Sequence, residues 1–393
     1  MSRPLRVLVA AFGDAGHAFP AIALAQALAG RGHEVVVETW ERWREPVEEA
    51  GLGFTGAEEY KVFPPPPPGS DGPKAAAAAR SLLPFIDEMR PDVVLSDILT
   101  LAPALAAEAA GVPRATLIPH VHPVHGDGLP LFGSGLRAAR TGLGRAVWRA
   151  AGPVLEAGLR RGRRELNEER AALGLAPLER FHGGISDGLA LVATYPQLEY
   201  PRRWPAHVHV TGPMFFELPY PDVELPDGNG PLVLVAPSTS QDPDGRLVRV
   251  ALEALGDEPV RVVATRNREE GAPDVVAPDN AVVVEWLSYA QVMPRASLVI
   301  CHGGHGTVAR ALAEGVPVLV CPAIGDMAET GARVAWAGAG LMVPGRLLSP
   351  GTLRLASRSI LRGRRFAARA AVIAADDHGG ALLGAESVER FVV

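Results

Sequence analysis

The sequence predicts an α/β fold in which two Rossmann-like, doubly wound parallel-sheet domains face each other across a cleft. Short apolar runs of strand length alternate with helical segments, and parallel strands need such crossovers to reconnect. The alternation stops at Tyr220–Gly230, a segment rich in proline, glycine and aspartate, and then starts again. The 393 residues also exceed what a single hydrophobic core usually organises.

The first half opens with a buried strand and a helix. Leu5–Ala11 is apolar at nearly every position, which is typical of a strand covered on both faces. A helix is expected from about Ala18 to Ala29, and the next strand at Glu34–Glu38. Five consecutive prolines in Phe63–Pro68 predict a surface loop, either a connector or the border of a pocket. Three further apolar runs predict strands: Val93–Leu95, Ala115–Ile118 and Leu189–Ala193.

The second half repeats this pattern. Its expected strands are Leu232–Ala236, Val260–Ala264, Ala281–Val284, Leu298–Cys301, Val318–Cys321 and Leu341–Val343. A last helix, roughly Ala381–Phe391, is expected to cross back to the first domain. We therefore divide the chain into an N-terminal domain (1–219), a linker (220–230), a C-terminal domain (231–375) and a crossing C-terminal helix (376–393).

Composition excludes several classes of protein. Hydrophobic residues make up 48% of the chain and charged residues 21%, as in compact globular proteins. The net charge of −6 gives no reason to expect nucleic acid as a partner. Cys301 and Cys321 lie in apolar runs, so we expect buried thiols and no disulfide. The chain has no apolar leader and no apolar run of about 18 residues, which predicts a cytoplasmic protein without a transmembrane segment. We expect a monomer or a homodimer.

The most informative segment is the glycine-rich turn that follows the expected strand Leu298–Cys301. The turn, His302–Thr307, leads into a helix that starts near His305. It holds three glycines that let the backbone approach a ligand and point N–H groups at it: Gly303, Gly304 and Gly306. The helix N-terminus adds partial positive charge, and the His302 imidazole and the Thr307 hydroxyl are further donors. The segment therefore predicts a diphosphate site, because packing alone would explain one glycine but not three.

A candidate acid–base pair is expected at the corresponding edge of the first sheet. His17 follows the first strand at the start of a helix, where Pro20 fits an early turn. An imidazole with a pKa of about 6.5 suits a general base near pH 7, although a histidine in this place can equally face solvent or cap the helix. Asp97 ends a strand and can orient such a base or cap the next helix. Asp92 precedes that strand and is expected at the opposite edge.

These motifs resemble the nucleotide-sugar-dependent glycosyltransferases of the UDP-glucosyl/glucuronosyltransferase-like family, which include bacterial natural-product enzymes with the GT-B fold. The resemblance extends over nearly the whole chain, and its specific part runs from Trp286 through Gly340. It implies that His17 is the general base and that Asp97 orients it. It also implies a donor site formed around the nucleotide base, the diphosphate and the sugar by Trp286, His302, Gly303, Gly304, Gly306, Thr307, Arg310, Asp326 and Met327.

Three positions depart from the family pattern. Arg310 stands where the family usually has a glutamate on the ribose hydroxyls, Met327 where it often has glutamine on the sugar, and Thr330 where asparagine is common. Arginine has no hydrogen-bond acceptor, so we expect Arg310 to lie on a phosphate or to point into solvent. The ribose contact is then lost, unless a neighbour such as Glu329 restores it. We therefore expect thymidine diphosphate (TDP)-linked or deoxy sugars to be accepted at least as well as UDP-glucose.

Other residues are expected to border the two substrates. The loop after the strand Leu232–Ala236 contributes donor contacts from Ser238, Ser240 and Gln241, and the acceptor side is expected to include Phe12, His120 and His122. The histidines of Pro119–His125 lack a nearby cysteine or acid that would complete a zinc site. Asp242-Pro-Asp244 has the form used by metal-dependent glycosyltransferases, but it is explained more simply as a turn and helix start. We therefore expect no metal.

The sequence thus favours an inverting glycosyltransferase that moves a sugar from a UDP- or TDP-linked donor to a small hydrophobic or phenolic acceptor, with no cofactor beyond this co-substrate. Two alternatives stay open, a nucleotide-sugar epimerase or hydrolase and a non-catalytic nucleotide-sugar-binding partner subunit; the presence of both His17 and Asp97 argues against the second. The arginine-rich segment Leu136–Arg170 is expected to be a solvated face. Its alternative is peripheral contact with an anionic membrane, which would imply a lipid-linked acceptor.

Overall fold

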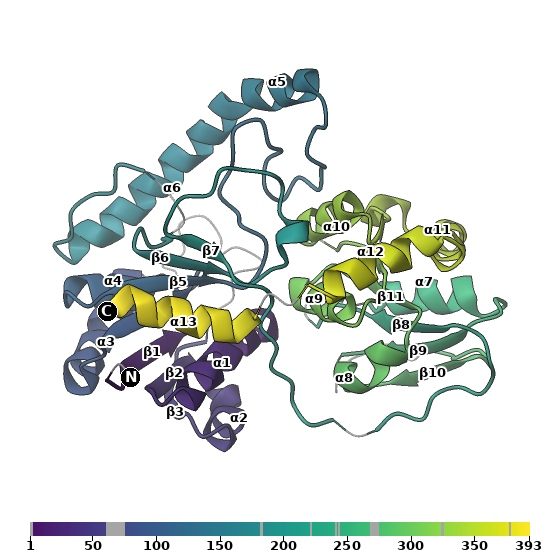
Figure 1. Ribbon diagram of the computed structural model, residues 1–393, viewed down its shortest axis with the longest axis horizontal. Helices are drawn as coiled ribbons and strands as arrows, with labels where there is room; N and C mark the ends of the chain where they lie inside the picture. The colour runs from purple at the N-terminus through teal and green to yellow at the C-terminus, as the bar shows by residue number, and fades with distance from the viewer. Residues whose placement is uncertain are drawn as a thin grey trace.

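Two α/β domains make up the molecule, and a long connector leads from the first to the second (Figure 1). The computed structural model describes residues 3–59, 75–180, 184–220, 222–239, 242, 244–267, 275–323, 326–376 and 379–393. The expected loop Phe63–Pro68 and the expected donor residues Ser240 and Gln241 lie outside these ranges.

The N-terminal domain is built on a seven-stranded parallel sheet in the order β3-β2-β1-β4-β5-β6-β7. Its strands are β1 (Arg6–Ala10), β2 (Glu34–Trp40), β3 (Gly53–Ala57), β4 (Val93–Asp97), β5 (Arg114–Ile118), β6 (Leu189–Val192) and β7 (Val208–Val210). Strands β3 and β7 are absent from the sequence prediction. β3 contains two glycines and β7 has only three residues, so neither produces an apolar run.

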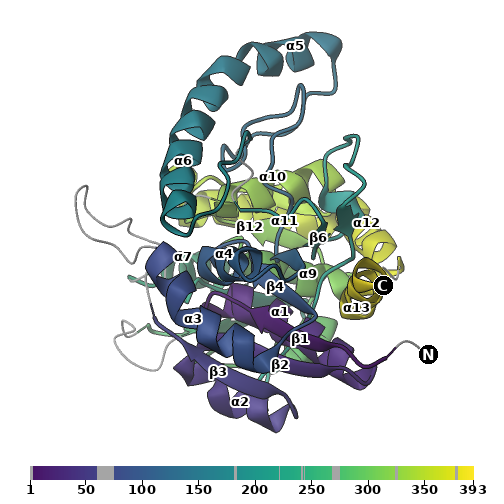
Figure 2. The same ribbon diagram turned by 90° about the vertical axis from the view of Figure 1, so that its left-hand side faces the viewer.

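The described residues of the first domain form the helices α1 (Ala15–Gly30), α2 (Arg44–Glu49), α3 (Ala75–Met89), α4 (Leu101–Ala109), α5 (Gly142–Ala150) and α6 (Gly152–Ala172). Helices α5 and α6 extend away from the sheet as a projecting arm (Figures 1 and 2). The arm carries the arginine-rich segment, in which Arg161 pairs with Glu165 at 2.9 Å. It also exposes the apolar side chains of Leu143 and Val147. No described helix has both the length and the apolar character needed to cross a bilayer.

The C-terminal domain holds a six-stranded sheet in the order β10-β9-β8-β11-β12-β13, again parallel throughout. Its strands are β8 (Leu232–Ala236), β9 (Arg261–Thr265), β10 (Ala281–Val284), β11 (Leu298–Cys301), β12 (Val318–Val320) and β13 (Gly340–Met342). Its helices are α7 (Arg246–Leu255), α8 (Tyr289–Val292), α9 (His305–Ala313), α10 (Asp326–Ala337), α11 (Pro350–Arg362) and α12 (Arg364–Ala374). The predicted fold class, two facing parallel α/β domains, is confirmed.

Both sheets reverse their strand order at one point, between β1 and β4 in the first and between β8 and β11 in the second. A crevice opens at such a switch point beyond the carboxyl ends of the strands, and ligands bind there. His17 follows β1, Asp97 ends β4, and His302 follows β11. The candidate residues therefore come from the two switch points.

The last helix, α13 (Gly380–Val392), returns to the N-terminal domain and packs on α1 (Figure 1). Its residues Ala385 and Val388 are buried in the same core as α1. The carboxylate of Glu389 also accepts hydrogen bonds from Arg31 at 2.8 Å and pairs with His33 Nε2 at 2.9 Å. The chain terminus therefore stabilises the first domain.

A buried ion cluster joins the two domains. Arg333 of α10 donates to Glu199 Oε2 at 2.9 Å, to the Leu198 carbonyl at 3.1 Å and to Glu329 Oε1 at 2.8 Å. Its guanidinium also lies 3.7 Å from the ring centre of Tyr200. The three charged side chains are between 1% and 4% exposed, so each charge is stabilised by the opposite charges beside it and not by water.

Replacing Arg333 with leucine should therefore destabilise the protein strongly. The change leaves two carboxylates buried without their cation, which typically costs about 3–5 kcal/mol. Thermal and urea unfolding would measure the loss. The matched control is Arg161→Leu, which removes an exposed pair worth about 0.3–0.5 kcal/mol. Equal stabilities of the two variants would contradict a structural role for the cluster.

Candidate active site

His17 and Asp97 form a hydrogen-bonded pair at the switch point of the first sheet. His17 lies in the first turn of α1, and its Nδ1 is 2.9 Å from Asp97 Oδ1 and 3.0 Å from Oδ2. Asp97 is 2% exposed, whereas the side chain of His17 keeps 17% of its surface accessible. Because an ionised carboxylate only accepts hydrogen bonds, Nδ1 carries the hydrogen and Nε2 keeps its lone pair. The pair therefore presents a base at Nε2.

The environment adjusts the basicity of His17. Burial disfavours the charged imidazolium, but the charge and hydrogen bond of Asp97 outweigh it, so the pKa of His17 is raised. The charge of Asp326, the first residue of α10, adds to this effect from the opposite domain. Asp92 lies at the other edge of the sheet, as expected, where it pairs with Arg3 and accepts from the Arg6 N–H. The Arg3 guanidinium lowers the pKa of that carboxyl.

A second histidine lies beside the pair. His120 packs edge-on against His17 with ring centres 6.1 Å apart, and the ring centre of Phe132 lies 5.8 Å from that of His120. Burial and the neighbouring His17 lower the pKa of His120, which keeps its imidazole neutral. His120 and Phe132 thus form an aromatic wall next to the Nε2 base.

Two other residues expected on the acceptor side are buried. Phe12 is 4% exposed and packs edge-on against both His17 and Trp40, and its N–H lies 3.4 Å from Asp97. His122 is 4% exposed, contacts Arg202 at 3.1 Å, and burial lowers its pKa to about 3. Residues two apart share a face of an extended chain, but this chain bends at 119–121, so His120 and His122 lie in different surroundings. We correct the expectation for both: Phe12 packs against the ring of His17, and His122 belongs to the packing around Arg202.

The glycine-rich turn leads into the N-terminus of α9 on the opposite side of the cleft. Gly303 has φ +96°, and a side chain there would meet the Met327 carbonyl oxygen at 2.7 Å. A side chain at Gly304 would collide with His302 Nε2, whereas one at Gly306 would extend into open space. No side chain caps this helix, so its first N–H groups stay available to an anion.

His302 is held by the backbone of the preceding strand. Its Nδ1 lies 3.3 Å from the carbonyl oxygen of Ala236 at the end of β8. Since a carbonyl only accepts, Nδ1 is the protonated nitrogen, and the neutral ring has a lone pair at Nε2. Burial lowers the pKa of His302 and favours this neutral form.

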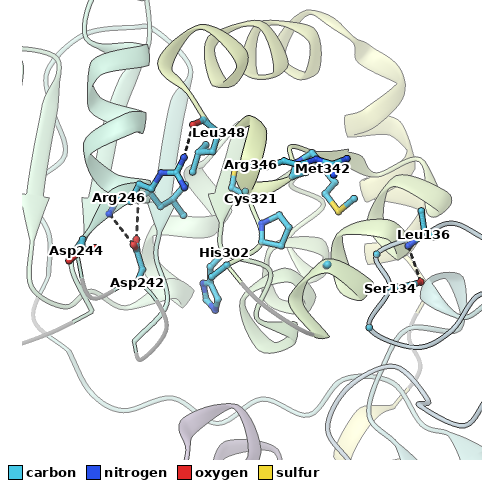
Figure 3. Close-up of a pocket in the computed structure, with 18 residues that line it drawn as sticks. Ser134, Leu136, Asp242, Asp244, Arg246, His302, Cys321, Met342, Arg346 and Leu348 are labelled. Carbon is cyan, nitrogen blue, oxygen red and sulfur yellow. Dashed lines mark hydrogen bonds between the residues drawn. The ribbon is translucent and has the colours of Figure 1, made fainter. Parts of the chain in front are cut away.

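Two cavities meet at His302. One, of about 370 Å³, lies between the domains and is lined by Gly16 and Phe19 of α1 and by Trp286, His302 and Thr307 of the second domain. The other, of about 700 Å³, lies on the far side of His302 between the segment 133–136 and Arg346 (Figure 3). The first has an aromatic end at Trp286 and an anion-binding end at α9, as a nucleoside diphosphate requires.

Asp242 is engaged in helix formation. Its carboxylate accepts from the N–H groups of Arg246 and Leu247 at 2.9 and 3.0 Å, at the start of α7 (Figure 3). This agrees with the turn and helix start expected for this segment. In the described part of the chain, no group of three His, Cys, Asp or Glu side chains is arranged to hold a metal ion.

Comparison with known proteins identifies the family. Residues 249–382 match the family described as Erythromycin biosynthesis protein CIII-like, C-terminal domain, and residues 21–164 match Glycosyltransferase Family 4. The 4'-demethylrebeccamycin synthase of Lentzea aerocolonigenes is 30% identical over 93% of this chain and 94% of that protein. The chain belongs to the nucleotide-sugar-dependent natural-product glycosyltransferases.

Other relatives agree with this assignment. The O-mycaminosyltylonolide 6-deoxyallosyltransferase of Streptomyces fradiae is 29% identical over 84% of this chain and 83% of that enzyme. Among solved structures, the glycotransferase of kitacinnamycin aligns with a TM-score of 0.76 at 20% identity, covering 99% of this chain and 100% of the other. The glycosyltransferase VinC in complex with DTDP aligns with a TM-score of 0.70 at 22% identity over 99% of both chains. These two structures support the GT-B fold.

The arginine that departs from the family pattern lines the cavity between the domains, and a carboxylate that the sequence does not indicate holds it there. Arg310 forms an ion pair with Glu217 at 2.8 Å and donates to the Phe216 carbonyl at 3.1 Å, so it does not point into solvent. Glu329, named as a substitute for the lost carboxylate, is buried on Arg333 instead. The solvent-facing alternative for Arg310 therefore does not hold.

Several pocket residues of this glycosyltransferase have no signal in the sequence. Glu217 and Tyr220 belong to the connector between β7 and β8 (211–231), of which the sequence indicates only a linker at 220–230. The ring of Tyr220 stacks parallel to Trp286 with centres 5.9 Å apart. Asn267, which follows β9, donates to the Pro237 carbonyl and the Tyr289 hydroxyl.

Two of the donor residues expected from the sequence lie close to the turns after β8 and β11. Ser238 is buried after β8, and the backbone carbonyl of Met327 faces Gly303.

Binding of a nucleoside diphosphate should take up a proton at His302. Its Nε2 can donate to a phosphate only after protonation, and the negative phosphates favour the protonated form. Titration calorimetry with UDP at pH 7.5, in buffers of different ionisation enthalpy, should show this uptake. The uptake should be lost in His302→Gln. Equal proton uptake by the wild type and this variant would contradict the assignment.

Proposed function

We propose that this glycosyltransferase moves a sugar from a UDP- or TDP-linked donor to a hydroxyl of a small hydrophobic or phenolic acceptor, with inversion at the anomeric carbon. One observation carries the proposal. The His17–Asp97 pair and the uncapped N-terminus of α9 belong to different domains, and one cavity is lined by the α1 turn around His17 and by the α9 N-terminus. A base on one side and an anion site on the other suit a single displacement.

In the proposed mechanism, His17 Nε2 takes the acceptor proton as the acceptor oxygen attacks the anomeric carbon. Asp97 holds the imidazole and stabilises the imidazolium that forms. The α9 N-terminus, Gly304 and protonated His302 stabilise the leaving diphosphate. Asp326, at the start of α10, exerts its charge on both His17 and His302 and is proposed to hold sugar hydroxyls, with Met327 beside it. Ser238 is proposed to contact the phosphates.

The names of relatives support the choice of substrates. The Streptomyces fradiae relative is named for a 6-deoxyallosyl group, and VinC was solved with DTDP. We propose by analogy that TDP-linked deoxy sugars are donors for this chain. On the acceptor side, His120 and Phe132 offer an aromatic wall beside His17, which suits a hydrophobic or phenolic acceptor.

Product analysis separates this proposal from the alternatives. The protein is incubated with UDP-glucose or TDP-glucose, with and without a panel of aglycones, and followed by mass spectrometry. The proposal requires glycosylated aglycone. Release of free sugar or a changed sugar without any aglycone would instead indicate a hydrolase or an epimerase.

His17→Ala should lower the rate of transfer to an alcohol acceptor by about 100- to 10,000-fold, because general-base catalysis typically contributes that much. Nucleotide binding should change little, since His17 belongs to the acceptor side of the cleft. Turnover and UDP titration measure the two effects separately. Near-normal turnover with an acceptor of ordinary pKa would exclude His17 as the base.

Asp97→Asn provides the companion measurement for this prediction. In the wild type, kcat/KM should fall as pH falls through the raised pKa of His17, because the base becomes protonated. Asparagine removes the charge that raises this pKa, so the acid limb should move to lower pH while the maximal rate decreases. An acid limb at the same pH in both proteins would assign the titration to another group.

Transfer should also persist in EDTA. The α9 N-terminus and His302 supply the positive charge that the leaving diphosphate requires, so no cation is needed in the proposed mechanism. Rates with EDTA and with added magnesium or manganese should agree within about twofold. Loss of activity in EDTA and its recovery on adding either metal would overturn metal independence and point to Asp242 and Asp244.

A further inference from the structure

A carboxylate from the connector enters the nucleotide-sized cavity. Glu217 lies after β7, lines this cavity, and is fixed there by three contacts. Its Oε2 accepts from Arg310 Nη1 at 2.8 Å, and its Oε1 accepts from the Ser288 hydroxyl at 2.8 Å and from the Ala290 N–H at 3.3 Å. The side chain keeps 21% of its surface accessible. Glu217 is thus both rigidly held and open to the cavity.

The contacts place Glu217 between the two ends of the cavity. Ser288 follows Trp286, the aromatic end, by two residues, and Arg310 lies one helical turn after Thr307 at the anion-binding end. A nucleoside diphosphate that spans these ends has its ribose between base and phosphates. The ribose is the part of such a ligand that offers hydroxyl donors to a carboxylate.

The number of acceptor positions on Glu217 limits what it can bind. A carboxylate has about four lone-pair positions. Two of them, on Oε1, serve Ser288 and Ala290, and one, on Oε2, serves Arg310. One position on Oε2 is left, which suffices for one hydroxyl but not for two. Arg310 also offsets the negative charge of Glu217, which would otherwise repel the diphosphate.

We propose that Glu217, held by Arg310, recognises the donor ribose through a single hydroxyl, the 3′-hydroxyl. The assignment rests on the proposed function: a site that accepts both UDP and TDP must use the one ring hydroxyl that ribose and 2′-deoxyribose nucleoside diphosphates share. The connector thereby supplies a specificity-determining residue, and the 2′-hydroxyl contributes little to donor selection.

Calorimetric titration with UDP, 2′-deoxy-UDP and 3′-deoxy-UDP tests this assignment with the base unchanged. The wild type should bind UDP and 2′-deoxy-UDP within about threefold of each other, and 3′-deoxy-UDP about tenfold more weakly, the size expected for one charge-assisted hydrogen bond. Glu217→Gln should weaken UDP and 2′-deoxy-UDP about tenfold and leave 3′-deoxy-UDP nearly unchanged.

Glu224→Gln is the matched control, because Glu224 is an exposed carboxylate of the same connector. It should bind all three nucleotides as the wild type does, and thermal unfolding should show that both variants are folded. The assignment is overturned if Glu217→Gln binds UDP as tightly as the wild type, or if loss of the 2′-hydroxyl costs as much as loss of the 3′-hydroxyl. A wild type that binds none of the three would instead overturn the proposed function itself.

Discussion

The geometry of the cleft depends on one buried cation, Arg333, held between Glu199 of the first domain and Glu329 of its own helix. Glu199 uses its second oxygen to accept from the His122 N–H at 2.6 Å, at the start of the loop that carries Phe132. Glu329 lies one turn after Asp326, the residue whose charge reaches His17. The cluster therefore fixes the aromatic wall of the first domain and the start of α10 in the second relative to each other. Buried charges tolerate little displacement from their partners, so the two halves of the site are held in register.

The electrostatics of the site follow from this arrangement. The first domain contributes His17 paired with Asp97, which we propose as the base, and the second contributes the positive end of α9 with a neutral histidine beside it. The His17–Asp97 pair and the positive helix end thus come from different domains. The connector adds the Glu217–Arg310 pair, which carries no net charge and so leaves the field at α9 available to a diphosphate. Its contact with Arg310 also ties the connector to the second domain.

The sequence predicts those parts of the site that depend on local order along the chain. Asp97 ends β4 and His17 lies in the first turn of α1, which follows β1, so both lie at the same edge of one parallel sheet and their proximity follows from topology. Of the glycines in the α9 turn, Gly303 and Gly304 stand where a side chain would collide, whereas Gly306 faces open space. The contacts that escape prediction join distant segments. Glu217 and Arg310 are 93 positions apart, and the linker composition around Glu217 conceals its role. His122 shares a motif with His120, yet Arg202, 80 positions away, determines where it points. Such pairings arise from tertiary packing, which no pattern of hydrophobicity encodes.

In the proposed function, the acceptor is activated on the His17 side while the diphosphate leaves on the α9 side, so that transfer is a single displacement. The anomeric configuration of the product tests this most directly. With an α-linked nucleotide sugar as donor, proton NMR of the purified product should show a β-linked sugar, since the attacking and leaving groups are on opposite faces of the anomeric carbon. An α-linked product would contradict the account, because retention requires attack from the face on which the diphosphate leaves or a covalent intermediate.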